Sequence, residues 1–431
     1  MNIKNIDKGK LVLVVIAVLL LFFEVYRISS FCLTWDEGLT YNNFVRPIFR
    51  GEESIVRTGL EYFFHPGSCS ANNHWLNTLL IGIIDRITGI QYNEYIIRLP
   101  IFCFFLIYLT GILLAYCRQY ISFTEAYMLM LSYYVDEFFV LARGYAFALT
   151  LIFIGIYGMK RWSATKEMKC LLGALASFTL AEVANTIALL PVAALFFVIF
   201  IHLVKSKVLV DFIRRYWIWL SGLAVVNFLM IMYHFKAARA DGSLYYNKEG
   251  SVWSILREYV GFLSPIFAQK LLLIYIVIVV VSVIMVLHSK GKRGSFYFTG
   301  AWFLYLLITY VGIKVCDEGF PTGRELIPAY ALFIVSLQEM FNMIGCKLEN
   351  RRKNAFSIVG CILLCISFAT QINLDGTRDW GNYAKVKEEA YHILEIQEKV
   401  DRKEEQYKSE GMQFYRDKIL QEYGYDIFIE E

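Results

Sequence analysis

Residues 74–90, "HWLNTLLIGIIDRITGI", decide the membrane topology predicted for the rest of this chain. The segment is apolar, yet it is shorter than the ~20 residues that a helix needs to cross a bilayer. It also holds Asp85 and Arg86 side by side. Every later loop would change sides if this segment crossed, so its placement fixes the topology of the chain.

The composition around it is that of a polytopic membrane protein. The 431 residues are 57% hydrophobic and 19% charged, whereas a soluble domain is nearer half apolar and a quarter charged. No small-residue cleavage site follows the first apolar run, so we expect that run to be a retained span and not a signal peptide. About eleven runs are long enough to cross: 11–28, 97–117, 121–140, 144–160, 168–184, 185–204, 214–234, 266–288, 296–315, 325–345 and 354–372.

Loop charge chooses between the two topologies. Four loops are rich in lysine and arginine: 159–169, 205–215, 289–294 and 347–353. With 74–90 on the surface, all four lie on the side of the amino-terminal lysines, which the positive-inside rule makes cytoplasmic. The sequence therefore predicts a cytoplasmic amino terminus, an outward carboxy terminus and surface helices in the first outer loop, 29–96.

The predicted architecture is an all-α membrane domain over 1–372. A small helical, extracytoplasmic tail follows over 373–431, where the sequence turns polar and keeps apolar residues at helical spacing. Nine cysteines cannot all pair, and most lie in apolar runs, where they act as small hydrophobes. Whether Cys32 and Cys69 form a disulfide stays open at this stage.

On this topology, unusual polar residues gather at the outer face. They come from five separate segments and include Asp36, Glu37, His65, Asn73, His74, Arg98, Asp136, Glu137, Arg143, Tyr145 and Arg324. Ionisable groups at the edge of a membrane bundle are functional candidates. A cluster from five segments is a stronger indication than any single member.

Each of these residues also has an ordinary explanation. Arg98 and Arg324 could mark helix ends at the lipid headgroups, and Asp136 with Glu137 could lie in solvent at a bend. The histidines lack the spacing of a metal site. Asp36 has the weakest ordinary explanation, because it directly follows the first span.

The outer face has the groups that glycosyl transfer from a lipid phosphate requires. Phosphate oxygens are well held by the planar fork of arginine. Three arginines are candidates for that role: Arg98, Arg143 and Arg324. An acceptor hydroxyl needs a base, for which Asp36 is placed. Glu37 or Glu137 could orient it, or share a divalent cation such as Mg²⁺ or Mn²⁺ with it.

Several motifs together resemble the bacterial GT-C membrane glycosyltransferases. These are "TWDEGLTY" after the first span, "HPGSCSANNHWLNTLLIGIIDRITGIQYNEYIIRLP", "ARGYA" and "PTGRELIPAY". The nearest branch is the one with the Rgt-like, aminoarabinose and protein mannosyl transferases. The resemblance covers roughly residues 8–335, and its most specific part is the acidic pair combined with the "ANNHWLN…RLP" block.

The resemblance implies a transferase that uses a polyprenyl-phosphate sugar at the outer face of a bacterial inner membrane. It implies that Asp36 is catalytic, with Glu37 beside it, and that Asp136 or Glu137 is the second acidic position. Arg143 and Arg324 match its basic residues near the carrier phosphate. The acceptor, whether glycan, lipid or protein, stays open, and we expect no nucleic-acid partner.

Two other functions fit the same residues. A transporter or flippase of lipid-linked sugars would also place arginines and carboxylates in a bundle, although such proteins more often show repeats and broken helices near mid-membrane. The other is a structural partner that has the same fold without activity. The sequence favours the enzyme because the acidic and basic residues are retained together at one face.

Overall fold

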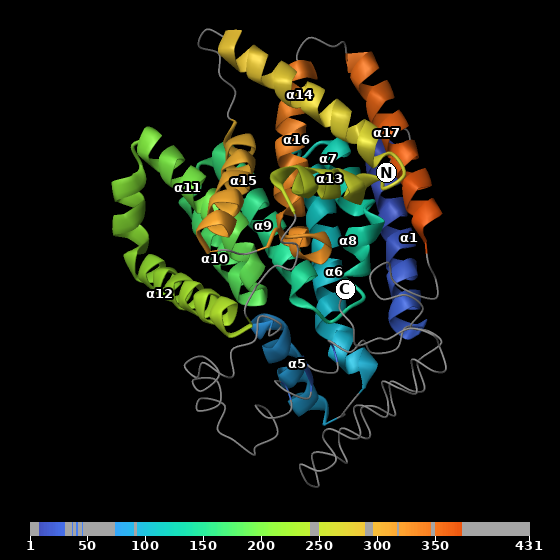
Figure 1. The fold of residues 1–431 in the computed structure, drawn as a ribbon. Helices are drawn as coiled ribbons and strands as arrows, with labels where there is room; N and C mark the ends of the chain where they lie inside the picture. The colour runs from blue at the N-terminus through green and yellow to red at the C-terminus, as the bar shows by residue number, and fades with distance from the viewer. Residues whose placement is uncertain are drawn as a thin grey trace, which may run out of the picture.

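The computed structural model describes residues 8–30, 37, 40–41, 45, 74–89, 93–241, 250–288, 296–316, 319–345 and 350–372. Within these ranges the chain is built from helices and has no β-strands, which confirms the all-α fold class (Figure 1). The predicted tail over 373–431 lies outside the described residues, as do Cys32 and Cys69.

The described residues form a series of helices. In chain order they are α1 (Lys8–Ser30), α5 (Trp75–Thr88), α6 (Glu94–Cys117), α7 (Phe123–Met130), α8 (Tyr133–Glu137), α9 (Gly144–Thr165), α10 (Met168–Ala184), η3 (Thr186–Ala188), α11 (Leu189–Lys205), α12 (Leu209–Asp241), α13 (Val252–Leu263), α14 (Ala268–His288), α15 (Tyr297–Cys316), η4 (Gly323–Ala329), α16 (Tyr330–Gly345) and α17 (Asn350–Gln371).

Six helical segments in the described part of the chain are long and apolar enough to cross a membrane. They are Lys8–Ser30, Glu94–Cys117, Thr186–Lys205, Leu209–Lys236, Ala268–Met285 and Gly323–Ile344. These segments make the chain a multi-pass membrane protein; they support six of the eleven predicted spans. A further apolar helix, Ser357–Gln371, is shorter.

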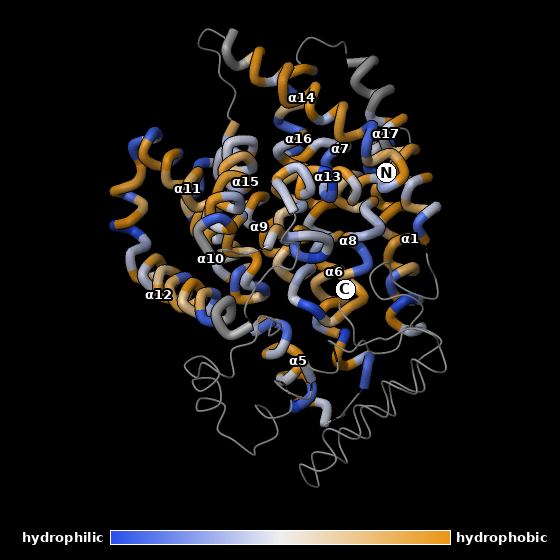
Figure 2. Tube along the Cα trace, in the orientation of Figure 1, coloured by the Kyte–Doolittle hydropathy of each residue, from blue (hydrophilic) through white to orange (hydrophobic). Residues whose placement is uncertain are grey.

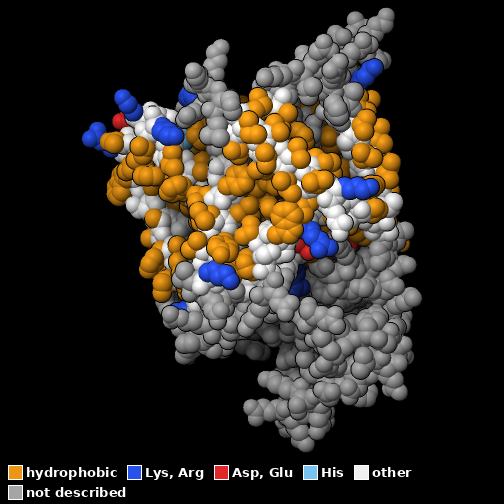
Figure 3. Space-filling model, turned by 45° about the horizontal axis from the view of Figure 1, so that its top comes forward, with side chains coloured by type: hydrophobic (Ala, Val, Ile, Leu, Met, Phe, Trp, Pro, Cys, Tyr) orange, Lys and Arg blue, Asp and Glu red, His pale blue; other side chains and the backbone are white. Residues whose placement is uncertain are grey.

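Burial separates central helices from peripheral ones. The apolar window of Gly323–Ile344 is 72% buried, whereas those of Leu209–Lys236 and Ala268–Met285 are 17% and 22% buried. The peripheral helices therefore present their apolar side chains outward, as a lipid environment requires. Figure 3 shows the result as a broad apolar surface interrupted by few charged side chains.

The continuous span predicted at 121–140 is wrong. The segment forms two short helices, α7 and α8, separated at Leu131 and Ser132. Carbonyls near the end of α7 find partners elsewhere: Tyr330 donates to the Met128 carbonyl at 2.7 Å and Tyr108 to the Leu129 carbonyl at 2.9 Å. Contacts with residues distant in sequence thus satisfy the helix end and stabilise the break.

Helix α5 is shorter than a helix that crosses a bilayer. It has 14 residues and ends at Gly89, whose φ of 67° and backbone N–H bond to the Asp85 carbonyl form a left-handed cap. One face is buried against the bundle through Asn77, Ile81 and Asp85. In Figure 1, α5 lies beyond the lower end of the bundle.

The two ends of the bundle differ in chemistry. The start of α1, the end of α6 and the α9 residue Lys160 line one pocket, so Lys10 and Lys160 share one end. We call it the lysine end, and the opposite end the α5 end. Figure 2 shows hydrophilic residues at the turn between α11 and α12 and again near α5 and the start of α6, with apolar helix segments between.

Candidate functional site

Glu37 and Arg98 form a buried, two-pronged ion pair at the α5 end. Arg98 Nε donates to Glu37 Oε1 at 2.9 Å, and Arg98 Nη2 donates to Glu37 Oε2 at 2.7 Å. Both side chains are fully buried. Asn93 caps α6 by accepting the backbone N–H groups of Tyr95 and Ile96, which fixes the start of the helix that carries Arg98. The guanidinium predicted to hold a phosphate is therefore engaged by Glu37.

The same ion pair holds the bend that precedes α9. The Ala142 backbone N–H donates to Glu37 Oε1 at 2.8 Å, and Asn77 Nδ2 donates to the Ala142 carbonyl at 2.6 Å. Tyr41 adds a bond from its hydroxyl to Asp85 Oδ1 at 2.7 Å. The first loop, α5, α6 and this bend are thereby tied together. The geometry gives Glu37 a positioning role.

His74, Arg143 and Tyr145 lie together beside this bend, and Arg324 lies within electrostatic range of His74. The rings of His74 and Tyr145 pack edge to face with centroids 5.2 Å apart. Arg143 lies over the Tyr145 ring at 5.9 Å, within cation–π range. These residues, predicted from three distant motifs to share one site, are brought together by the start of α5, the start of α9 and η4.

The backbone around Arg324 is tightly specified. Thr322 and Glu325 form a capping box at the start of η4, with the Thr322 N–H donating to Glu325 Oε2 at 2.9 Å. Gly323 adopts a φ of 47°, and a Cβ there would lie 2.8 Å from the Tyr134 hydroxyl. The "PTGRELIP" motif thus fixes the backbone at Arg324.

His74 is held neutral by its surroundings. Burial lowers its pKa well below the usual 6.5, and the positive charges of Arg143 and Arg324 lower the pKa further. Neither ring nitrogen of His74 has a hydrogen-bond partner among the described residues. A neutral imidazole has one donor and one acceptor, which suits a ligand hydroxyl.

We expect His74 to make the fold sensitive to acid. Below pH 6.5, the usual histidine pKa, the unfolded chain binds a proton at His74 that the folded chain does not, so the free energy of unfolding falls as pH falls. His74→Gln should flatten this slope by up to about 1.4 kcal/mol per pH unit. Thermal unfolding in detergent from neutral to mildly acidic pH measures this pH dependence. Equal slopes in the wild type and in His74→Gln would contradict a buried, neutral His74.

A second buried cluster joins α1 to α8. Arg27 Nη2 lies 3.8 Å from Glu137 Oε1, and both side chains are essentially buried. The Arg27 guanidinium also lies over the rings of Phe23, at 5.2 Å, and Tyr133, at 5.5 Å. The predicted second acidic position is therefore paired with a residue of the first span.

Glu24 and Asp136 complete this cluster. Neither oxygen of the Glu24 carboxyl group, nor Asp136 Oδ2, has a hydrogen-bond partner in the described part of the chain. Asp136 lies within electrostatic range of Glu24, Arg27 and Glu137. Sequence reasoning missed Glu24 and Arg27, although two ionisable residues three apart in a span share a helix face and signal function.

The end of α10 supplies two more polar side chains that sequence reasoning missed. Glu182 is 1% exposed, and its Oε2 has no partner among the described residues. Asn185 accepts the Ile187 N–H at 3.0 Å through Oδ1, while its Nδ2 lacks a described partner. The sequence did contain a signal for them, because a glutamate and an asparagine stand at the end of an otherwise apolar run.

Other predicted site residues lie outside the described ranges. These are Asp36, His65 and Asn73. In the part of the chain that the structure describes, no group of three or more His, Cys, Asp or Glu residues could hold a metal ion. The proposed cation between Asp36 and Glu137 stays a prediction, and Glu137 forms an ion pair with Arg27.

Comparison with models of protein families, with curated proteins and with solved structures gave no match. The function is therefore argued from the residues and their geometry.

Proposed function

We propose that this chain is a GT-C-type membrane glycosyltransferase. It moves a sugar from a polyprenyl-phosphate donor to a hydroxyl of a glycan, lipid or protein at the extracytoplasmic face of a bacterial inner membrane. One observation carries the proposal: Arg143 and Arg324 converge on a neutral, buried His74 beside Tyr145. This is a site with positive charge for a phosphate and uncharged polar groups for a sugar.

Arg143 and Arg324 would bind the phosphate of the donor. Their charges act on His74 from two separate places, the N-cap of α9 and η4, so an anion beside His74 would be attracted by both. His74 and Tyr145 would then contact the sugar, because an imidazole and a phenol offer hydrogen bonds without adding charge. Aromatic faces also suit the apolar face of a sugar ring.

Asp36 would act as the base. The acceptor oxygen bonds to the anomeric carbon as the bond from that carbon to the phosphate oxygen breaks. The acceptor proton passes to Asp36, and the arginines stabilise the departing polyprenyl phosphate. Glu37, adjacent in sequence, is fixed by Arg98 and by the Ala142 N–H, which would anchor the segment that contains the base.

A transporter or flippase of lipid-linked sugars is the second candidate, and one observation favours it. The break between α7 and α8 lies in the buried centre of the chain, and discontinuous helices are typical of transporters. The glycosyltransferase remains the better proposal, because the arginines and the histidine meet at one end of the bundle.

Substitution of Asp36 tests the proposal. We expect Asp36→Asn to lower transfer from a radiolabelled polyprenyl-phosphate sugar by about 100-fold or more, as loss of a general base does. The matched control is Asp211→Asn, an exposed aspartate of α12, which should leave the rate unchanged. Activity of the wild type after chelation tests the predicted cation separately.

Reconstituted vesicles distinguish the candidates. Release of the carrier phosphate that depends on Asp36 supports the transferase. Movement of intact donor across the bilayer without release would establish the transporter instead. Wild-type rates in the folded Asp36→Asn protein would reject Asp36 as the base, and neither reaction in the wild type would favour the inactive partner.

A further inference from the structure

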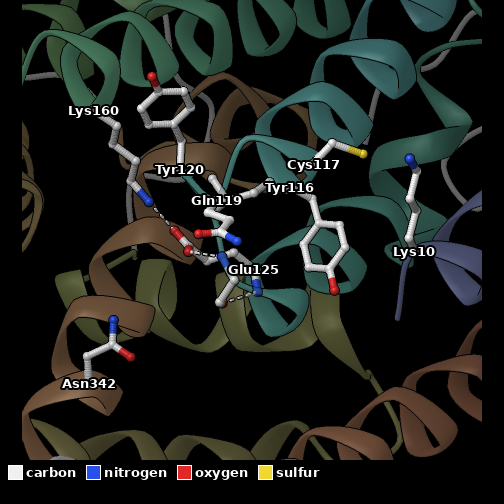
Figure 4. Close-up of a pocket in the computed structure, with 10 residues that line it drawn as sticks. Lys10, Tyr116, Cys117, Gln119, Tyr120, Glu125, Lys160 and Asn342 are labelled. Atoms are coloured by element: carbon white, nitrogen blue, oxygen red, sulfur yellow. Dashed lines mark hydrogen bonds and ion pairs between the residues drawn. The ribbon is translucent and has the colours of Figure 1, made fainter. Parts of the chain in front are cut away.

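A polar pocket of about 600 Å³ opens at the lysine end, remote from the proposed site. The start of α1, the end of α6, the start of α7, α9 and α16 all contribute to its lining. Figure 4 shows side chains from these elements around one space, Lys10 and Tyr116 on one side and Lys160 on the other. Its volume is in the range of small-molecule sites.

The turn between α6 and α7 shapes this pocket. Gln119 adopts a φ of 61°, a conformation that non-glycine residues rarely hold. Ser122 then caps α7: the Glu125 N–H donates to Ser122 Oγ at 3.1 Å, and the Ser122 N–H donates to Glu125 Oε2 at 2.8 Å. The pocket is thus built on a turn in which the Ser122 and Glu125 N–H groups both have partners.

The acidic residue of the pocket is already neutralised. Glu125 accepts the Ser122 N–H through one oxygen, and its other oxygen forms an ion pair with Lys160. The Glu125–Lys160 pair does not balance the charge of Lys10, so Lys10 gives the pocket a net positive charge. Tyr116 and Gln119 add a hydroxyl and an amide to the lining. An anion with several oxygen acceptors matches this set of groups.

The position of the pocket indicates that the anion belongs to a lipid. Lys10 stands at the start of the apolar helix Lys8–Ser30, where a bilayer core gives way to headgroups. Beyond it, the outward side chains are apolar: Leu11 is 54% exposed, Val15 is 49% exposed, and on α6 Leu114 is 50% exposed. A headgroup in the pocket could therefore have its acyl chains along α1 and α6.

We propose that this pocket binds the phosphate of an anionic phospholipid headgroup, with Lys10 as its main cation. On the topology predicted from loop charge, the lipid belongs to the cytoplasmic leaflet, where basic pockets between helices bind anionic headgroups. The inference does not depend on the glycosyltransferase function, because it uses no residue of the α5 end.

The test is lipid binding by the full chain in uncharged detergent. Phosphatidylglycerol, phosphatidylcholine and inorganic phosphate are titrated separately, with thermal stability and native mass spectrometry as readouts. We expect phosphatidylglycerol to be retained and to raise the unfolding temperature, and the other two to have little effect. Lys10→Gln should weaken phosphatidylglycerol binding about tenfold, as loss of a charged hydrogen bond does.

The control is Lys169→Gln, which removes an exposed lysine from α10 without touching the pocket. It should bind phosphatidylglycerol as the wild type does. Equal binding of the two lipids, or equal loss in both variants, would overturn the proposal. Stabilisation by inorganic phosphate alone would make this a free-phosphate site and would also overturn it.

Discussion

Arg98→Met is expected to lower the free energy of unfolding by about 3–5 kcal/mol, the cost of leaving a buried charge without its partner. Arg98 holds both oxygens of Glu37 in a fully buried pair. Removing the guanidinium leaves the Glu37 carboxylate buried, away from water, without the charge that balances it. Equilibrium unfolding in detergent measures the loss.

A double variant separates the charge from the packing. In Arg98→Met with Glu37→Gln, the charge is gone, and the amide oxygen can still accept the Ala142 N–H that Glu37 binds at 2.8 Å. We expect the double variant to recover a large part of the stability lost in the single one. If it is less stable than Arg98→Met, the carboxylate is not the source of the cost.

An exposed ion pair provides the control. Arg161 and Glu167 lie 3.3 Å apart with side chains 37% and 54% exposed, and such pairs contribute about 0–1 kcal/mol. Arg161→Met should therefore change stability little. A loss as large as that of Arg98→Met would show that any arginine-to-methionine change is damaging, which contradicts a special role for the buried pair.

The sequence predicts those features that depend on composition and period. Apolar runs and loop charge predict a helical membrane protein, and the short apolar run over 74–90 corresponds to the short helix α5. The grouping of these polar residues could also be anticipated in part. His74, Arg143, Tyr145 and Arg324 come from three motifs, and the structure places them together.

Features that depend on contacts between distant segments could not be predicted. The break within 121–140 requires Tyr108 and Tyr330 to satisfy carbonyls of α7, and nothing in that run marks it. The engagement of Arg98 by Glu37 is similar, because an arginine at a helix start has many possible partners. Glu24 and Arg27 are a different case. Their spacing within the first span could have been recognised from the sequence, but they were overlooked among the apolar residues around them.

Gly144→Ala is expected to destabilise the protein by about 3 kcal/mol, at or beyond the upper end of the usual cost of overpacking. A Cβ at residue 144 would lie 2.1 Å from the Ala184 carbonyl oxygen and 2.8 Å from Cγ and Nδ1 of His74. The first obstacle is backbone at the end of α10, which cannot rotate away as a side chain can. Helix α9 would have to move from α10, or His74 would be displaced.

Gly173→Ala is the matched control, because a Cβ there meets nothing within 4 Å. Gly173 lies inside α10, where alanine is the better helix former by about 1 kcal/mol, so this variant should be slightly more stable than the wild type. If Gly144→Ala lowers the free energy of unfolding and Gly173→Ala raises it, the cost of Gly144→Ala comes from the contact between α9, α10 and His74. Because that contact also positions Arg143 and Tyr145, residual folded Gly144→Ala protein should lose the sugar transfer that we propose, while Gly173→Ala should keep it.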